Sequence, residues 1–303
     1  MGVHKATATL LCNLSQRGLL SGTLLQLGVQ SISAEAKDLI RQTFISASQQ
    51  NLTEFSSGKK RFWHSLGFSE VKSLDISEFE GAEIICDLNK PVESNLHERF
   101  DVVFDGGTLE HIFDTKSALL NIDSFLKVDG LVIHEVPCSN AVDHGFYSFS
   151  PTFFQDYYPN QGYEVIEILL VVSRGRRAKI YRYSNPPPRK YIRLNWGNKT
   201  VNVWCVARKK MKSNFFLPQQ SMYLNAWSRF SNNPADSTQM AEEQNLGRII
   251  RGKATTAFSL IAQRYPLADD LVRLVGDRIH KFLFPRDHKL DVLFKVKSKK
   301  ETA

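Results

Sequence analysis

The 303-residue sequence lacks several features that would set its class at once. No apolar run approaches the ~20 residues of a membrane-spanning helix, and the Leu-Leu-Cys core near the start is too short for a secretory signal. The four cysteines (Cys12, Cys86, Cys138 and Cys205) are scattered, without the paired spacing of a zinc site. No carboxylate cluster with ligand spacing occurs either. We therefore expect a cytoplasmic protein that needs no metal.

Glycine is sparse where a nucleotide-binding loop would need it. Residues 19–27 read as a first buried strand, and Gly28 ends it, but Gln30 and Ile32 follow at the next alternate positions. The Gly-x-Gly-x-x-Gly turn of a nicotinamide or flavin oxidoreductase is absent. An oxidoreductase is therefore the weakest of the function classes considered.

Positive charge is concentrated in the last third of the chain. Residues 208–303 contain 18 Lys and Arg against 9 Asp and Glu, a net of +9, whereas the whole chain is +8. This asymmetry predicts two parts with different roles: a domain over residues 1–210 and a basic helical extension over residues 211–303. Residues 249–261 and 267–284 of the extension look like basic amphipathic helices.

The basic extension has three interpretations. It covers an acidic acceptor such as a nucleotide-sugar or lipid-linked glycan, it rests peripherally on an anionic membrane, or it is a solvated face. Nucleic-acid binding ranks last, because no known RNA or DNA module is recognisable and aromatic residues do not interleave with the basic ones.

Residues 1–210 alternate between strand-like and helix-like patterns. The expected strands are residues 19–27, 71–74, 82–86, 101–104, 131–136, 164–172 and 200–207, and the expected helices are residues 34–44, 62–66, 115–126 and 151–158. Continuous apolar strands that alternate with helices predict an α/β fold. We expect a Rossmann-like, doubly wound, mostly parallel sheet of about seven strands, with the last strands forming an antiparallel edge.

Three expected strands in succession end at an aspartate: Asp75, Asp87 and Asp105. In open α/β sheets, ligands bind outside the carboxyl ends of the strands. A carboxylate there can accept two hydrogen bonds from the hydroxyls of a ribose, and one on the next strand suits an adenine amino group. Each aspartate alone has an alternative role in capping a helix or starting a turn. Three in register favour the ligand interpretation.

Four segments together resemble class I S-adenosylmethionine-dependent methyltransferases: residues 74–77 (LDIS), 86–89 (CDLN), 100–111 (FDVVFDGGTLEH) and 125–134 (FLKVDGLVIH). The resemblance covers roughly residues 20–210. It departs from the family pattern after the first strand, where an acidic residue followed by Gly-x-Gly-x-Gly is replaced by Gln26, Gly28, Gln30 and Ile32.

The resemblance implies the cofactor S-adenosylmethionine and a role for each matching residue. Asp75 would bind the ribose hydroxyls with Ile76 beside the adenine, Asp87 would bind the adenine amino group with Leu88 nearby, Asp105 would lie by the methionine part, and Gly28 is the retained loop glycine.

A second stretch, residues 144–151 (HGFYSFSP), resembles a segment of bacterial methyltransferases associated with glycan and natural-product gene clusters. His144 and His111 are candidates to take a proton from an acceptor hydroxyl, and Tyr147 and Phe146 to contact the acceptor. Structural roles are the alternative for all four. The resemblance implies O-methylation of a sugar or small metabolite. The alternative function is a catalytically inactive, methyltransferase-like binding or scaffold protein.

Overall fold

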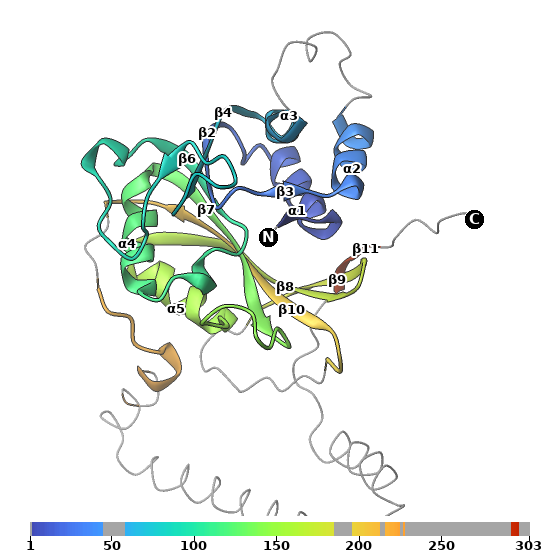
Figure 1. The fold of residues 1–303 in the computed structure, drawn as a ribbon. Helices are drawn as coiled ribbons and strands as arrows, with labels where there is room; N and C mark the ends of the chain where they lie inside the picture. The colour runs from blue at the N-terminus through green and yellow to red at the C-terminus, as the bar shows by residue number, and fades with distance from the viewer. Residues whose placement is uncertain are drawn as a thin grey trace, which may run out of the picture. The chain divides into compact units, whose positions relative to one another are not determined.

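The computed structural model describes residues 2–44, 58–184, 196–212, 216–224, 227 and 292–296 (Figure 1). The chain divides into two compact units, one of Met1–Ser184, Arg193–Pro218 and Leu290–Ala303, the other of Asn185–Ile192 and Gln219–Lys289. The predicted helices over residues 249–261 and 267–284 lie outside the described residues, and the predicted domain boundary at residue 210 stays a prediction.

A nine-stranded sheet forms the centre of the first unit. Its strands are β2 (Gly22–Leu27), β4 (Phe68–Asp75), β5 (Ile84–Ile85), β6 (Phe100–Asp105), β7 (Leu126–Ser139), β8 (Tyr163–Arg174), β9 (Arg177–Arg182), β10 (Thr200–Lys209) and β11 (Val292–Val296). A separate parallel pair joins β1 (Gly2–Val3) to β3 (Ser31–Ile32).

Five helices accompany the sheet in the described part of the chain: α1 (Lys5–Gln16), α2 (Ala34–Phe44), α3 (Gly58–Ser65), α4 (Thr115–Phe125) and α5 (Pro151–Asn160). Two short 3-10 turns, η1 (Ser94–Leu96) and η2 (Leu109–His111), follow β5 and β6. The predicted helices over residues 34–44, 115–126 and 151–158 are confirmed to within two residues at each end. Helix α1 was not predicted, because the apolar residues near the start of the chain were considered only as a possible secretory signal.

Half of the sheet has the order of a doubly wound nucleotide-binding fold. Strands β5, β4, β2, β6 and β7 are neighbours in that order and all pair in parallel. Numbered among themselves along the chain, they read 3-2-1-4-5, the order of the first five strands of a Rossmann fold. The winding reverses between β2 and β6, and a ligand crevice is expected at the carboxyl ends of these two strands.

The other half of the sheet is antiparallel. Strand β10 lies between β7 and β8 and pairs antiparallel with both, and β9 and β11 extend the edge beyond β8. The predicted antiparallel edge is confirmed, but the predicted count of about seven strands is two short. Strand β9 was missed because its charged, alternating sequence follows β8 after a tight turn at Gly175.

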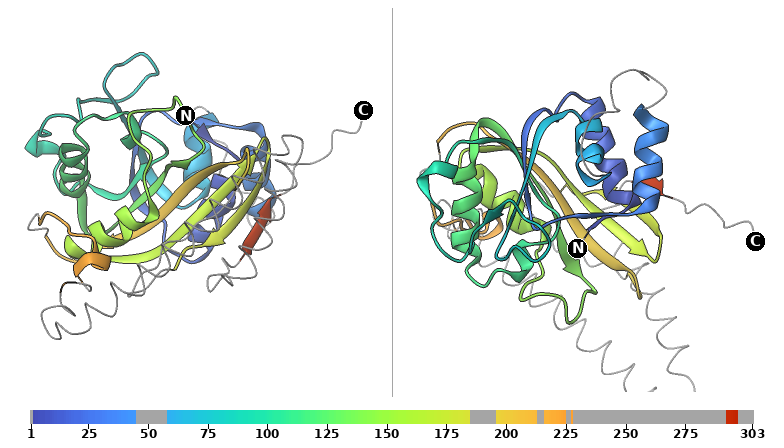
Figure 2. Two further views of the ribbon diagram at one scale, coloured as in Figure 1. Left: turned by 90° about the horizontal axis from the view of Figure 1, so that it is seen from below. Right: turned by 45° about the horizontal axis from the view of Figure 1, so that its top comes forward.

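Helices cover both faces of the sheet (Figure 2). On one face α1, α2 and α3 pack over a core in which Trp63 contacts Phe68 and Phe104. On the other face lie α4 and α5, with the fully buried Phe125 and Phe154. The predicted Rossmann-like α/β architecture is confirmed. None of the described helices has the length and hydropathy that a membrane span requires.

A buried lysine fixes the end of α4 to the sheet. Lys209, only 2% exposed, donates from Nζ to the backbone oxygens of Asp123 (2.7 Å) and Leu126 (3.3 Å). It also pairs with the Asp123 carboxylate at 3.2 Å. These carbonyls belong to the last turn of α4, where the helix leaves acceptors unpaired and favours positive charge.

Replacing Lys209 by Met should lower the free energy of unfolding by about 3 kcal/mol, because the half-buried Asp123 carboxylate and the carbonyls at the end of α4 lose a buried cation. Urea denaturation measures the loss. The neighbouring Lys210→Met is the control: its pair with Asp129 is exposed to solvent, so its loss should change the free energy of unfolding far less. Equal losses for the two variants would contradict the role of Lys209.

Candidate cofactor crevice and acceptor site

The ends of β2, β4 and β6 converge at Gly28. This glycine has a φ of +74° and donates from its backbone N–H to Leu74 O at 2.7 Å. A Cβ here would lie 2.9 Å from Thr108 Oγ1 and 4.0 Å from Asp75 Oδ2. The backbone conformation and the close approach of Thr108 both favour glycine. Gly28 and Asp75, two of the predicted cofactor residues, are therefore brought together at the point where the winding reverses.

Asp75 offers a carboxylate oxygen at this crevice. Asp75 is half-buried, and its Oδ1 accepts from the backbone N–H of Ile76 at 2.7 Å. Three exposed apolar side chains follow along the same rim: Ile76, Phe79 and Ile85 are 67%, 91% and 54% exposed. An open carboxylate beside an apolar rim matches the chemistry of a nucleoside, which joins a hydroxylated ribose to a flat apolar base.

Asp87 and Leu88 have local partners. The Asp87 carboxylate accepts from Asn89 N (3.0 Å) and Asn89 Nδ2 (2.9 Å) and pairs with Lys90 at 3.2 Å. The hydrogen bonds from Asn89 lower the pKa of Asp87. Leu88 is 3% exposed and belongs to the core. Both residues thus shape the turn after β5, and their contact with adenine stays a prediction.

Asp105 is fully buried and tied to its surroundings through both oxygens. Its Oδ1 accepts from the backbone N–H groups of Gly107, Thr108 and Leu109, at 3.3, 2.7 and 3.2 Å. Its Oδ2 lies 2.7 Å from His134 Nδ1, and His134 Nε2 lies 2.5 Å from the Tyr158 hydroxyl. Asp105 therefore caps η2. Its proximity to a methionine group stays a prediction.

Gln30 fills the space that a glycine-rich loop would leave open. Its side chain is buried and donates from Nε2 to Leu27 O at 3.1 Å, while Oε1 has no partner among the described residues. A Cβ on Gly106 would lie 2.7 Å from that Oε1. Gly106, in the turn after β6, therefore lies directly against the Gln30 side chain. The sequence showed only that Gln30 occupies a position where the family pattern has glycine.

A cavity of about 430 Å³ lies beside the crevice, on the face of the sheet covered by α3. Its lining includes Gln26, Gln30, Trp63, Ser73 and Glu83. Small-molecule sites usually measure about 300–1,000 Å³, so the cavity is large enough to take part of a ligand.

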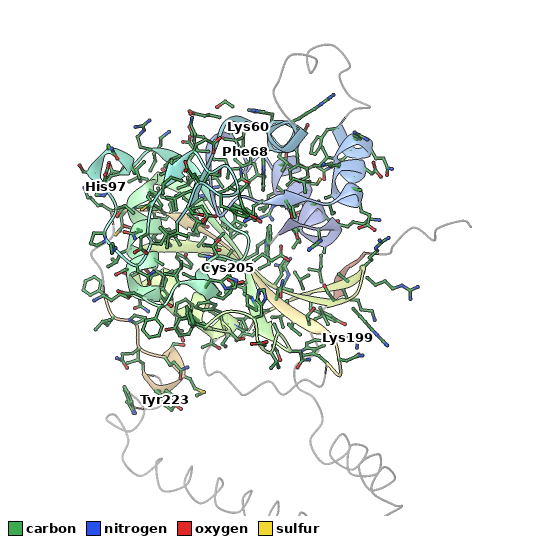
Figure 3. All side chains as sticks on the ribbon, viewed as in Figure 1. Lys60, Phe68, His97, Lys199, Cys205 and Tyr223 are labelled. Atoms are coloured by element: carbon green, nitrogen blue, oxygen red, sulfur yellow. The ribbon has the colours of Figure 1, made fainter. Side chains whose placement is uncertain are left out.

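Glu83 anchors the wall of this cavity. Its Oε2 accepts from Ser73 N (2.8 Å) and Ser73 Oγ (2.5 Å), and its Oε1 pairs at 2.7 Å with Lys60, which is labelled on α3 in Figure 3. Burial alone would raise the pKa of Glu83, but the bonds from Lys60 and Ser73 outweigh it and lower that pKa to about 2.

A lowered carboxyl pKa stabilises the fold above its unfolded value of 4.5, and this stability is lost as the pH falls toward 2. Replacing Glu83 by Gln should therefore cost about 0.5–1 kcal/mol at pH 7, since the pair is partly solvent-screened. The difference from wild type should shrink below pH 4.5 in urea denaturation. Glu78→Gln, an exposed change on the same loop, is the control. A difference that persists unchanged near pH 2 would contradict the assignment.

The turn after β6 and the loop after β7 bring together Glu110, His111 and His144. Glu110 is fully buried, and neither carboxylate oxygen has a hydrogen-bond partner in the described part of the chain. His144 Nε2 lies 3.4 Å and His111 Nε2 3.9 Å from Glu110 Oε1, and the two imidazole centroids are 5.1 Å apart. The predicted pair of histidines is thus one cluster. Its third member, Glu110, was missed although it adjoins His111.

Burial, together with the nearby Asp105 carboxylate, raises the pKa of Glu110 to about 8. Burial and the neighbouring His144 lower the pKa of His111. Both shifts favour the neutral forms of the two groups at neutral pH.

The predicted acceptor residues form an aromatic group next to this cluster. Phe146 is 65% exposed and packs edge-on against Phe113, itself 70% exposed, with centroids 5.7 Å apart. The Tyr147 hydroxyl donates to Phe113 O at 2.9 Å. The Tyr147 side chain therefore holds the backbone at Phe113 in place. Phe113, which was not predicted from the sequence, forms one exposed aromatic surface together with Phe146.

No protein-family model matches this chain, and no curated protein does. Among solved structures, one similar chain is 1,6-didemethyltoxoflavin-N1-methyltransferase from Burkholderia thailandensis, with its substrate and S-adenosylhomocysteine bound. It is 13% identical over 68% of this chain and 80% of its own, with a TM-score of 0.40. Another is the branched-chain polyamine synthase of Thermus thermophilus with N4-aminopropylspermidine and 5′-methylthioadenosine, 13% identical over 69% and 58% of the two chains, with a TM-score of 0.37.

Both TM-scores are below 0.5, so these two likenesses establish no family. What this chain binds has to be inferred from its own strand order and residues.

Proposed function

We propose that this protein is an S-adenosylmethionine-dependent methyltransferase that acts on an oxygen of a sugar or another small metabolite. This function is best supported by the crevice at the carboxyl ends of β2 and β6, where the strand order of the sheet reverses. Gly28 has a φ of +74° there, and a Cβ on it would lie 4.0 Å from Oδ2 of the half-buried Asp75.

The residues at the crevice fit the cofactor. Asp75 would accept hydrogen bonds from the ribose hydroxyls, Ile76 would pack beside the adenine, and the backbone at Gly28 would allow close approach. The buried, unpartnered Oε1 of Gln30 is an acceptor that a cofactor N–H could satisfy. Bound S-adenosylmethionine would supply an electrophilic methyl group.

The acceptor would lie toward the histidines and the exposed face of Phe146. His144 and His111 are 42% and 47% exposed in their side chains. Either imidazole could take the proton that a hydroxyl loses as its oxygen is methylated. The exposed ring of Phe146 offers a face on which the apolar side of a sugar could stack. Basic residues of the extension over residues 211–303 would suit an acidic acceptor.

The second candidate is a binding or scaffold protein with a methyltransferase-like fold. Gln30 favours it, because its side chain takes up space at the loop that should embrace the cofactor. A folded protein that binds neither S-adenosylmethionine nor S-adenosylhomocysteine would support this alternative.

Replacing Asp75 by Ala should weaken S-adenosylhomocysteine binding about 10- to 100-fold, the loss expected when hydrogen bonds to a charged group disappear. Isothermal titration calorimetry measures the affinity. Glu78→Ala, an exposed change three residues away, is the matched control and should bind like wild type. An Asp75→Ala affinity equal to that of Glu78→Ala would rule out Asp75 as the ribose ligand.

A further inference from the structure

Glu110 is a buried carboxyl group that accepts no hydrogen bond from the described residues and lies at the base of an open cluster. Its side chain is 0% exposed, and neither oxygen receives a hydrogen bond from the described residues. A buried polar group that stays unpaired costs about 1–3 kcal/mol, and more if it is charged. Such a group is rarely kept without a ligand, a water or an ion to satisfy it.

The group that faces Glu110 consists of two imidazoles. One ligand atom each from Glu110, His111 and His144 lies within 4.8 Å of the other two. His144 Nε2 is 3.4 Å from Glu110 Oε1. Two ligands of one tetrahedral zinc ion, at bond lengths of about 2.0–2.1 Å, lie about 3.4 Å apart. His111 Nε2 lies 3.9 Å from the same oxygen, and its ring is half-exposed.

The backbone keeps the two halves of the cluster together. The Glu110 carbonyl accepts from the N–H groups of Phe146 (2.7 Å) and Tyr147 (3.3 Å), which follow His144 closely. Gly145 has a φ of +75°, and a Cβ there would meet Glu110 O at 2.8 Å. The loop that carries His144 is thus fastened directly over the turn that carries Glu110 and His111.

We propose that Glu110, His111 and His144 bind one divalent transition-metal ion of the Zn²⁺ class. Two imidazoles and one carboxylate are a donor set of catalytic zinc sites and of open non-haem iron sites. The half-exposed histidines leave the remaining coordination positions facing solvent, where a water or an oxygen of a small molecule completes the shell. This reverses the expectation from sequence that the protein needs no metal.

A bound metal would also narrow the acceptor class of the proposed methyltransferase, and this narrower inference rests on the proposed function. An acceptor hydroxyl bound at an open position would have a lowered pKa, and His111 and His144 would then act as ligands rather than as bases. The acceptor class narrows to small molecules with oxygen donors next to the methylated position, such as vicinal hydroxyls or a hydroxyl beside a carboxylate.

Calorimetry with ZnCl₂ tests the site on the full chain, purified without a histidine tag and treated with a chelator. Wild type should bind one zinc ion per chain. Glu110→Gln and His144→Ala should each weaken binding about 100-fold or more, since each removes one of three ligands. His97→Ala is the matched control, because His97, labelled in Figure 3, is exposed and outside the cluster. It should bind zinc like wild type.

Thermal denaturation of the same proteins gives a second readout that needs no activity. Zinc should raise the melting temperature of wild type and of His97→Ala, and raise that of His144→Ala much less at the same zinc concentration, because the stabilisation follows the affinity of the folded site for the ion. His144 is half-exposed, so its loss should leave the fold intact even if Glu110→Gln folds poorly.

Absence of stoichiometric zinc binding to wild type, or equal affinity in wild type and His144→Ala, would overturn the proposal. S-adenosylhomocysteine titrations of the same variants keep the two proposals apart. Retained cofactor binding with no zinc binding rejects the metal site alone. Zinc binding without cofactor binding rejects the methyltransferase and leaves the metal site standing.

Discussion

The Asp105 carboxylate is the contact on which the geometry of the whole site depends. One oxygen collects three backbone N–H groups and so shapes the turn after β6, and the other engages His134 on β7 and, through it, Tyr158 on α5. A carboxylate that is buried and fully hydrogen-bonded defines one local structure, because any other arrangement leaves charge unpaired. The turn it shapes presents Thr108 to the Gly28 loop and Glu110 to the histidines.

The η2 turn therefore separates two groups of side chains, one that suits a nucleoside and one that suits a polar acceptor. On the β2 and β4 side lie an open carboxylate oxygen of Asp75 and exposed apolar side chains, which suit a nucleoside. On the β7 side lie Glu110, two imidazoles and an exposed phenylalanine, which suit a polar acceptor. A group-transfer enzyme needs a donor and an acceptor held next to each other, and the short η2 turn supplies that proximity.

Much of the parallel half of the fold could be predicted from sequence, because buried parallel strands are apolar runs and three of them end at an aspartate that marks the sheet edge. Asp75 and Gly28 followed from the same logic. Strand β9 was missed because it is only six residues long and its two buried apolar residues, Ala178 and Ile180, alternate with charged ones. Gln30 and Glu110 were missed for a related reason. Their burial depends on Gly106 and Gly145, which are distant in the chain, and local pattern carries no trace of such contacts.

The central claim is that the crevice between β2 and β6 binds S-adenosylmethionine. A crystal structure of the protein with S-adenosylhomocysteine tests it most directly. The account predicts density at the carboxyl ends of β2 and β4, with both ribose hydroxyls within hydrogen-bond distance of Asp75 and the sulfur directed toward the turn that carries Glu110 and His111. A ligand bound elsewhere, or a crevice without ligand density at saturating S-adenosylhomocysteine, would contradict it.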